Sequence, residues 1–314
     1  MKLISYISSL IIGASLILVF EPFNFWFLTF FIPLSLYFLI KDHDIKSSFY
    51  LGWFFGFGLW LIGIFWIENS IYFYGGATKS VSYFLVICLS VFLALLNGIF
   101  FGIFAYCKTK TNFDILFLFP SIWVGSEWLR EFLLSGFPWF YLGYTSLDNF
   151  FFSGFIPIFG VFGMSFILIF IPALIFVLGE SLISGRQKNI SLIYLTIFSL
   201  FLIASFSSYK VEWTTKKDEV NIVIIQPNIS IEEKWSFQGE NESINLFKSK
   251  IKEYSVKSKD KDILSIIFWP EVFLPGLSSK YTKVIDELEI YISESNFASI
   301  FGILSKSNNE EGVS

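Results

Sequence analysis

The stretch VSYFLVICLSVFLALLNGIFFGIFAY, residues 81–106, contains no charged side chain. An α-helix needs about 20 apolar residues to cross the hydrocarbon core of a bilayer, and this stretch exceeds that length. Inside the core a backbone must satisfy its own amide and carbonyl groups, which a single segment can do only as a helix. Residues 81–106 therefore predict a membrane-spanning helix.

Apolar runs of similar length recur on both sides of this stretch. Lys2 precedes the first run as in a signal peptide, but no small-residue cleavage site follows, so we interpret it as an anchor. The predicted fold is thus a polytopic α-helical bundle of about seven spans, at residues 3–20, 23–40, 49–67, 81–106, 113–133, 156–179 and 189–207. Gly52 and Gly56 have the spacing of small residues at helix contacts in the third span.

Composition separates a membrane part from a water-exposed part. Only 15% of the 314 residues are charged, against about 25% in soluble domains, which excludes disordered chains and argues against a purely soluble enzyme. Residues 1–209 carry 18 charges and residues 210–314 carry 30. We predict a transmembrane domain over 1–209, a linker over 210–220 and an α/β unit over 221–314.

The cysteine content and the net charge do not indicate a metal, a disulfide framework or a nucleic-acid partner. Two cysteines are too few for a disulfide framework or a usual zinc module. The net charge of -4 gives no reason to expect a nucleic-acid partner. We expect both cysteines, Cys88 and Cys107, to be packing residues of the fourth span.

Basic residues are distributed unequally between the two sets of loops, which predicts the orientation. Lys79 is the one basic residue in the opposite loops between spans, with Arg130 inside span five. The chain start and the loops after spans two, four and six contain Lys2, Lys41, Lys46, Lys108, Lys110, Arg186 and Lys188. We expect a cytoplasmic N-terminus and, after an odd number of crossings, a polar unit on the periplasmic face of a bacterial inner membrane.

Strand and helix patterns alternate after residue 221. Three apolar runs, 221–226, 263–269 and 298–304, predict buried strands, and 240–257 and 281–295 predict amphipathic helices. Helices over apolar strands are typical of an α/β layer. We expect Ile244, Leu246, Phe247 and Ile251 to form the apolar face of the first helix. For the second helix we expect Val284, Leu288, Ile290 and Ile292 to be available for burial.

Glu271 is the candidate catalytic residue. It follows a predicted strand between Pro270 and Pro275, at the sheet edge where α/β proteins build their sites. We expect it to be partly buried beside Trp269 and Phe273 and able to act as a general base. The alternative is a solvent-facing glutamate in a proline-bounded turn.

Several motifs resemble, in order, the apolipoprotein N-acyltransferase family, whose members carry a nitrilase-like carbon–nitrogen hydrolase domain. They are Phe20-Glu-Pro-Phe-Asn-Phe-Trp26, Gly52-Trp-Phe-Phe-Gly-Phe-Gly58, residues 66–76, Glu127-Trp-Leu-Arg130, Gly136-Phe-Pro-Trp139, Gly143-Tyr144, Gln226-Pro-Asn-Ile229, Lys234-Trp235 and Trp269-Pro-Glu271. Each motif is weak singly, but together they are specific and extend over nearly the whole chain.

The resemblance implies acyl transfer by a Glu-Lys-Cys triad without a metal or diffusible cofactor. A phospholipid donates an acyl chain to the cysteine, and the thioester passes it to the N-terminal amine of a diacylglyceryl-Cys lipoprotein. Glu271 matches the family's glutamate. The matching lysine and cysteine would follow residue 314, so we expect this sequence to be an incomplete, inactive part of the enzyme and of its nitrilase-like domain.

Further residues are candidates for substrate binding by the same resemblance. Glu127 and Arg130 share one face of span five and can pair; they either line a route for phospholipid headgroups or form a neutralised pair that only holds helix packing. Trp139 either lines an acyl-chain path or belongs to an interfacial aromatic belt. Trp235 occupies the family's Lys-Trp position beside the active-site mouth.

Two alternative functions remain open. One is a non-catalytic membrane protein that binds lipid or lipoprotein. The other is a membrane-tethered amidase, because a nitrilase-like domain can also pass its acyl group to water.

Overall fold

A computed structural model describes residues 2–133, 136–147, 149–184, 188–258 and 263–306. Arg186, one of the basic residues used to predict orientation, lies outside them, as does the predicted α/β unit from residue 307 on. The chain divides into two compact units, residues 1–213 and 214–314. Each is described by itself.

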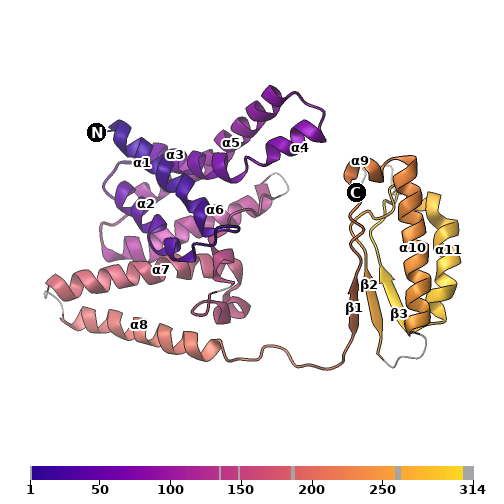
Figure 1. The fold of residues 1–314 in the computed structure, drawn as a ribbon. Helices are drawn as coiled ribbons and strands as arrows, with labels where there is room; N and C mark the ends of the chain where they lie inside the picture. Colours follow the sequence, from indigo (N-terminus) through magenta and orange to yellow (C-terminus); the bar gives the residue numbers. More distant parts are fainter. Residues whose placement is uncertain (1, 134–135, 148, 185–187, 259–262, 307–314) are drawn as a thin grey trace. The chain divides into compact units, whose positions relative to one another are not determined.

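The first unit is helical (Figure 1). Its elements are α1 (Lys2–Ser15), η1 (Leu16–Val19), η2 (Trp26–Phe30), α2 (Ile32–Ile40), α3 (Ile45–Gly63), α4 (Ile67–Phe73), α5 (Lys79–Cys107), the π-helical turn η3 (Asp114–Leu118), α6 (Phe119–Phe132), η5 (Leu142–Ser146), η6 (Ser153–Phe155), α7 (Ile156–Ser184) and α8 (Lys188–Ser208).

Four helices of the described residues are long and apolar enough to cross a membrane. They comprise α3, α5, α7 with its preceding turn, and α8 from Ser191. The helices over Leu3–Val19 and Trp26–Ile40 are apolar but shorter, because the chain turns between Phe20 and Phe25 rather than continuing as helix. The structure thus supports an apolar, helical N-terminal region, with four of the seven predicted spans at spanning length.

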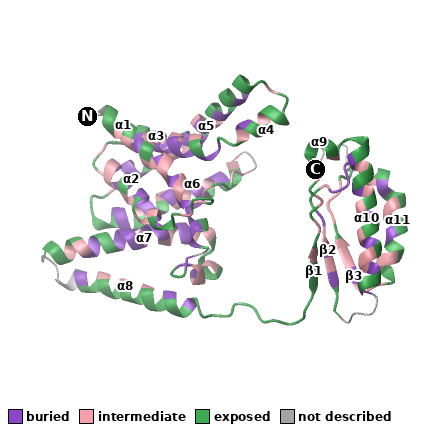
Figure 2. Cartoon of the chain, in the orientation of Figure 1, coloured by how far each residue is buried: buried purple, intermediate pink, exposed green. Residues whose placement is uncertain are grey.

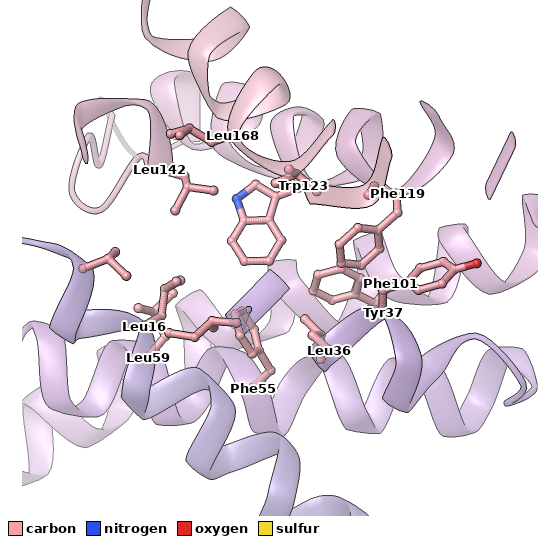
Figure 3. Packing of buried hydrophobic residues seen from close by; sticks show 14 of the residues in the cluster. Leu16, Leu36, Tyr37, Phe55, Leu59, Phe101, Phe119, Trp123, Leu142 and Leu168 are labelled. Atoms are coloured by element: carbon pink, nitrogen blue, oxygen red, sulfur yellow. The ribbon is translucent and has the colours of Figure 1, made fainter. Parts of the chain in front are cut away.

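Aromatic side chains fill the core of the first unit. Trp123 of α6 lies across the ring of Phe55 of α3, with centroids 5.6 Å apart, and Phe119 stacks on Phe101 of α5 (Figure 3). All four are at most 5% exposed. Buried residues collect where these helices meet, whereas the outer faces of the helices are exposed (Figure 2). Such outer apolar faces suit contact with lipid.

Glycines let helices α1, α3 and α5 approach at backbone distance. A Cβ added to Gly52 would lie 2.8 Å from the carbonyl oxygen of Asn97, and one at Gly56 would lie 2.9 Å from the Cα of Ala94. This confirms the helix-packing interpretation of both glycines. On the neighbouring face of α3, a Cβ at Gly58 would overlap the carbonyl oxygen of Leu10.

The second unit is a small α/β layer. Strands β1 (Asn221–Ile224), β2 (Ser265–Phe268) and β3 (Phe297–Ile300) form a parallel sheet in the order β1-β2-β3. Helices α9 (Ile231–Lys234), α10 (Phe237–Ser258) and α11 (Ser278–Ser293) belong to the same unit, and α10 and α11 lie on one side of the sheet (Figure 1). The sequence predicted all three strands and both long helices.

The helix-covered face of the sheet is the core of this unit. Phe247 and Ile251 of α10 and Leu288 of α11 are buried with Ile267 and Phe297 of the strands. Ile244, Leu246, Val284 and Ile292 pack against them. The predicted apolar faces are confirmed except for Ile290, which is 60% exposed because it lies on the outer face of α11.

The prediction that every strand is buried is wrong for β1. Ile222 and Ile224 are 58% and 77% exposed. In the parallel register they share a sheet face with Phe268 and Ile300, and α10 and α11 cover only the opposite face. The apolar composition of β1 predicted that both of its faces are covered, but the described residues cover only one of them.

Replacing Gly58 by alanine tests the close contact between α1 and α3. The added methyl group has no room beside the Leu10 backbone, so overpacking of about 1–3 kcal/mol should lower the thermal unfolding midpoint in detergent. Gly179→Ala is the matched control, since nothing lies within 4 Å of its added Cβ; it should leave the midpoint unchanged or raise it slightly. Equal midpoints for the two variants would contradict the packing described here.

Candidate functional site

Glu127 and Arg130 of α6 are buried, with 2% and 5% of their surfaces exposed. Oε1 of Glu127 accepts hydrogen bonds from Nε1 of Trp123 and from the backbone N–H of Leu142, each at 2.9 Å. Nη1 of Arg130 donates to the carbonyl oxygen of Trp139 at 2.8 Å. Within the described residues the two side chains form no direct ion pair, which corrects the prediction that they pair with each other.

Aromatic rings compensate the buried guanidinium. Its carbon lies 4.7 Å from the ring centroid of Trp60 and 5.0 Å from that of Tyr141. A cation over aromatic faces is stabilised by the ring quadrupoles, and more strongly when water is excluded. Arg130 therefore ties α3 and α6 to the segment 137–147. Neither Arg130 nor Glu127 lines a described cavity.

The held segment forms one wall of a cavity of about 450 Å³, which we call the Trp139 cavity. Its lining includes Phe20, Glu21, Asn24, Trp139, Phe140 and Tyr144. Trp139, predicted to bind substrate, is 41% exposed at this wall and lies 4.9 Å from the ring of Phe137.

Phe140 has a strained backbone. Its φ of 59° is unusual for a bulky residue and costs about 1–3 kcal/mol, so its surroundings must hold it. Two neighbours do so. Arg130 holds the preceding carbonyl, and Gly63 leaves room for the Phe140 ring, whose Cε2 would lie 2.6 Å from a Cβ at that position.

Glu271 lies at the carboxyl end of β2 and is exposed. The expected partial burial between two aromatic residues is therefore wrong. The rings of Trp269 and Phe273 contact each other at a tilt instead, with centroids 4.6 Å apart, and both are buried in the core with Phe247. Val272, with φ 47°, turns the chain between them.

A smaller cavity of about 140 Å³ lies beside this turn. Gln226 and Asn228 after β1, Lys234 of α9, Ser243 of α10 and Pro270 all contribute to its lining. Nζ of Lys234 donates to the backbone oxygen of Glu271 at 3.4 Å, so the Lys234-Trp235 and Trp269-Pro-Glu271 motifs meet at one sheet edge. Trp235 itself is 57% exposed.

The loop after Glu271 is held by a polar cluster that the sequence analysis missed. Tyr281, which is 1% exposed, places its hydroxyl 2.9 Å from Oε1 of Glu240 and 3.0 Å from the carbonyl oxygen of Pro275. Its single proton can bond one of them at a time. Lys280 pairs with Glu240 at 2.6 Å. The hydrogen bond from Lys280 lowers the pKa of Glu240, and that from Tyr281 adds to it.

Other candidate groups offer less. Among the described residues, no group of three or more His, Cys, Asp and Glu could hold a metal ion. Cys88 and Cys107 are exposed rather than packed in the interior as expected, because they lie on the outer face of α5. Residues 210–314 contain no cysteine.

Residues 12–174 match the family described as "Apolipoprotein N-acyltransferase N-terminal domain". Proteins named apolipoprotein N-acyltransferase are similar over nearly the whole chain. The one from Coxiella burnetii is 31% identical over 94% of this chain and 59% of its own length. Those from Pasteurella multocida and Haemophilus influenzae are 28% and 29% identical, over 96% and 92% of this chain and 57% and 53% of their own lengths.

The chain thus spans between 53% and 59% of the length of these three relatives.

Replacing Glu240 by glutamine tests the cluster that holds the Glu271 loop. The lowered pKa of Glu240 means that its stabilisation is complete above the unfolded value of about 4.3 and is lost as the pH falls through the folded value. We expect Glu240→Gln to destabilise the α/β unit by about 1 kcal/mol near pH 7 and by much less near pH 3.

Hydrogen exchange of peptides from α10 and α11, measured in the whole chain and corrected for the intrinsic rate, would report this difference. Glu289→Gln, on the exposed side of α11, is the control. A destabilisation that is the same at both pH values would contradict an ionic role for Glu240.

Proposed function

Because the chain belongs to the apolipoprotein N-acyltransferase family, we propose that its protein transfers a phospholipid acyl chain to the N-terminal amine of diacylglyceryl-Cys lipoproteins. The observation that carries this proposal is the similarity to three named transferases over more than nine tenths of the chain. It includes both units, and therefore the Trp269-Pro-Glu271 turn as well as the helical bundle.

In the proposed reaction Glu271 is the general base. It takes the proton of a cysteine thiol, whose sulfur attacks the ester carbonyl of the phospholipid and forms a thioester, while the lysophospholipid alcohol leaves with a proton. The lipoprotein amine then attacks the thioester and regenerates the thiol. The exposed position of Glu271 at the end of β2 supports this role, since a reacting group can approach it. We propose that the thiol and the catalytic lysine belong to the length of the relatives that this chain does not span.

We also propose that residues 221–314 are part of a nitrilase-like α/β domain. The parallel order β1-β2-β3 and the helices on one face support this. Ile222, Ile224 and Ile300, all more than half exposed, form an apolar surface on the other face. A further layer of the same domain would cover it.

The bundle is proposed to cross a bacterial inner membrane seven times, with its N-terminus in the cytoplasm. Besides the four long helices, the crossings would use α1–η1, η2–α2 and η3–α6. The contacts of buried Arg130 with the Trp139 carbonyl and with the rings of Trp60 and Tyr141 support the last of these, because an uncompensated charge in a span is costly.

Four residues are proposed to serve substrate binding in different ways. Trp139 and Trp235 are exposed aromatic residues that can contact lipid. Glu127 and Arg130 act as positioning residues, since they hold the segment that carries Trp139.

A reporter fused after residue 213 tests the odd number of crossings. Alkaline phosphatase, which is active only outside the cytoplasm, should be active at this position, and green fluorescent protein should be dark. The control is a fusion after Lys110, which should give the opposite pair of signals. Cytoplasmic signals at both positions would overturn the topology and the enzyme assignment together.

Replacing Glu271 by glutamine in the complete protein tests the general base. We expect the rate of acyl-enzyme formation, measured by mass spectrometry, to fall by a factor of about one hundred or more, because a positioned general base accelerates such a step by about that much. Membrane insertion should not change. Glu289→Gln is the matched control on the same unit and should retain normal acyl-enzyme. Free fatty acid in place of a lipid–amine product from the unmodified protein would instead indicate an amidase-like hydrolase.

A further inference from the structure

The Trp139 cavity combines a carboxylate with aromatic walls. It contains no residue of the Lys234-Trp235 or Trp269-Pro-Glu271 motifs. We propose that this cavity binds an ammonium group carried by a lipid, with Glu21 as the residue that selects for the charge. The inference rests on the proposed function, for which it specifies how an amine-bearing substrate is recognised.

The lining of the Trp139 cavity carries a negative charge. Among the described residues that line the cavity, Glu21 supplies the one carboxylate, and none is Lys, Arg or His. In the described part of the chain no cation forms a salt bridge with Glu21. Arg130, which holds the segment that carries Trp139, is itself buried against Trp60 and Tyr141 and bonded to the Trp139 carbonyl. The exposed Glu21 carboxylate thus lines the cavity without a salt bridge to any described cation, which favours a cationic ligand.

Aromatic side chains form the walls of the cavity. Phe20, Trp139, Phe140 and Tyr144 surround the same space, and the rings of Phe20 and Phe140 meet edge to face at 5.1 Å. Aromatic faces attract ammonium groups, and cages of them recognise such ligands in proteins. The same rings also suit the methylene groups next to a lipid amine. A volume of about 450 Å³ lies within the usual range for small-molecule sites, about 300–1,000 Å³.

The described lining also lacks a basic side chain that would pair with an anion. Val19, Pro138, Thr145 and Leu147 are the other described lining residues besides Asn24 and carry no charge. The Thr145 hydroxyl donates to the Leu142 carbonyl oxygen at 2.8 Å. A phosphate would meet the Glu21 carboxylate without a basic partner. The lining is therefore complementary to the ammonium group rather than to the phosphate of a lipid headgroup.

Two substrates of the proposed reaction carry this group. One is the phospholipid donor, where its headgroup carries an amine such as ethanolamine, and the other is the acceptor, whose terminal α-amine is protonated near neutral pH. The shared chemistry is an ammonium group attached to acyl chains.

Equilibrium binding to the whole chain in detergent micelles, followed by native mass spectrometry, tests the proposal with two ligand pairs. The first pair is dioleoyl phosphatidylethanolamine and dioleoyl phosphatidylglycerol. The second is a diacylglyceryl-Cys dipeptide with a free α-amine and the same dipeptide N-acetylated. Glu21→Gln removes the charge and keeps the shape, and Glu212→Gln is the control, because Glu212 is exposed in the same unit and outside the cavity.

We expect the unmodified chain and the control to bind at least one ammonium-bearing ligand about tenfold more tightly than the member of its pair that lacks an ammonium group, and Glu21→Gln to remove this preference. The pair that shows the preference identifies the donor or the acceptor as its source. Equal affinities within both pairs, or a preference that survives in Glu21→Gln, would overturn the proposal. Binding requires no acyl transfer, so this result stands separately from the fate of the proposed reaction.

Discussion

The burial of Arg130 is the constraint on which one end of the helical unit depends. A guanidinium removed from water is costly unless its surroundings replace what hydration supplied. Here the rings of Trp60 and Tyr141 and the carbonyl of Trp139 supply that replacement, and they come from α3 and from the segment after α6. The ion therefore determines where the segment lies. Together with Gly63, which leaves room for the Phe140 ring, it holds Phe140 at its positive φ.

The α/β unit positions its candidate residue by a related arrangement, with a buried hydroxyl in place of a buried ion. Tyr281 reaches from α11 to Glu240 of α10 and to the carbonyl of Pro275. The two helices that cover the sheet thus also hold the loop after Glu271. At the other end of the same turn, Trp269 bonds Ser299 of β3 through its indole N–H. The side chain of Glu271 is exposed, while the residues on both sides of it are held by these hydrogen bonds.

Much of this fold could be predicted from the sequence, because apolar length and periodicity are local signals. They located the helices of the bundle and all three strands, and the proline-bounded Glu271 followed a strand as expected. The partners of buried polar groups could not be predicted in this way. Nothing local in the sequence relates Arg130 to Trp60, or Glu240 to Tyr281, because each pair meets only after the chain has folded. Apolar composition likewise could not predict that only one face of β1 is covered, since a strand covered on both faces has the same apolar sequence.

The open face of the sheet has a practical consequence for anyone who studies this unit alone. Ile222 and Ile224 project from β1, which is also an edge strand with unpaired backbone groups on one side in the described sheet. Apolar edges of this kind attract strands of other molecules and promote aggregation. Residues 214–314 released from the rest of the protein should aggregate and be difficult to keep monodisperse, so a soluble fragment for ligand work would need polar substitutions on that face.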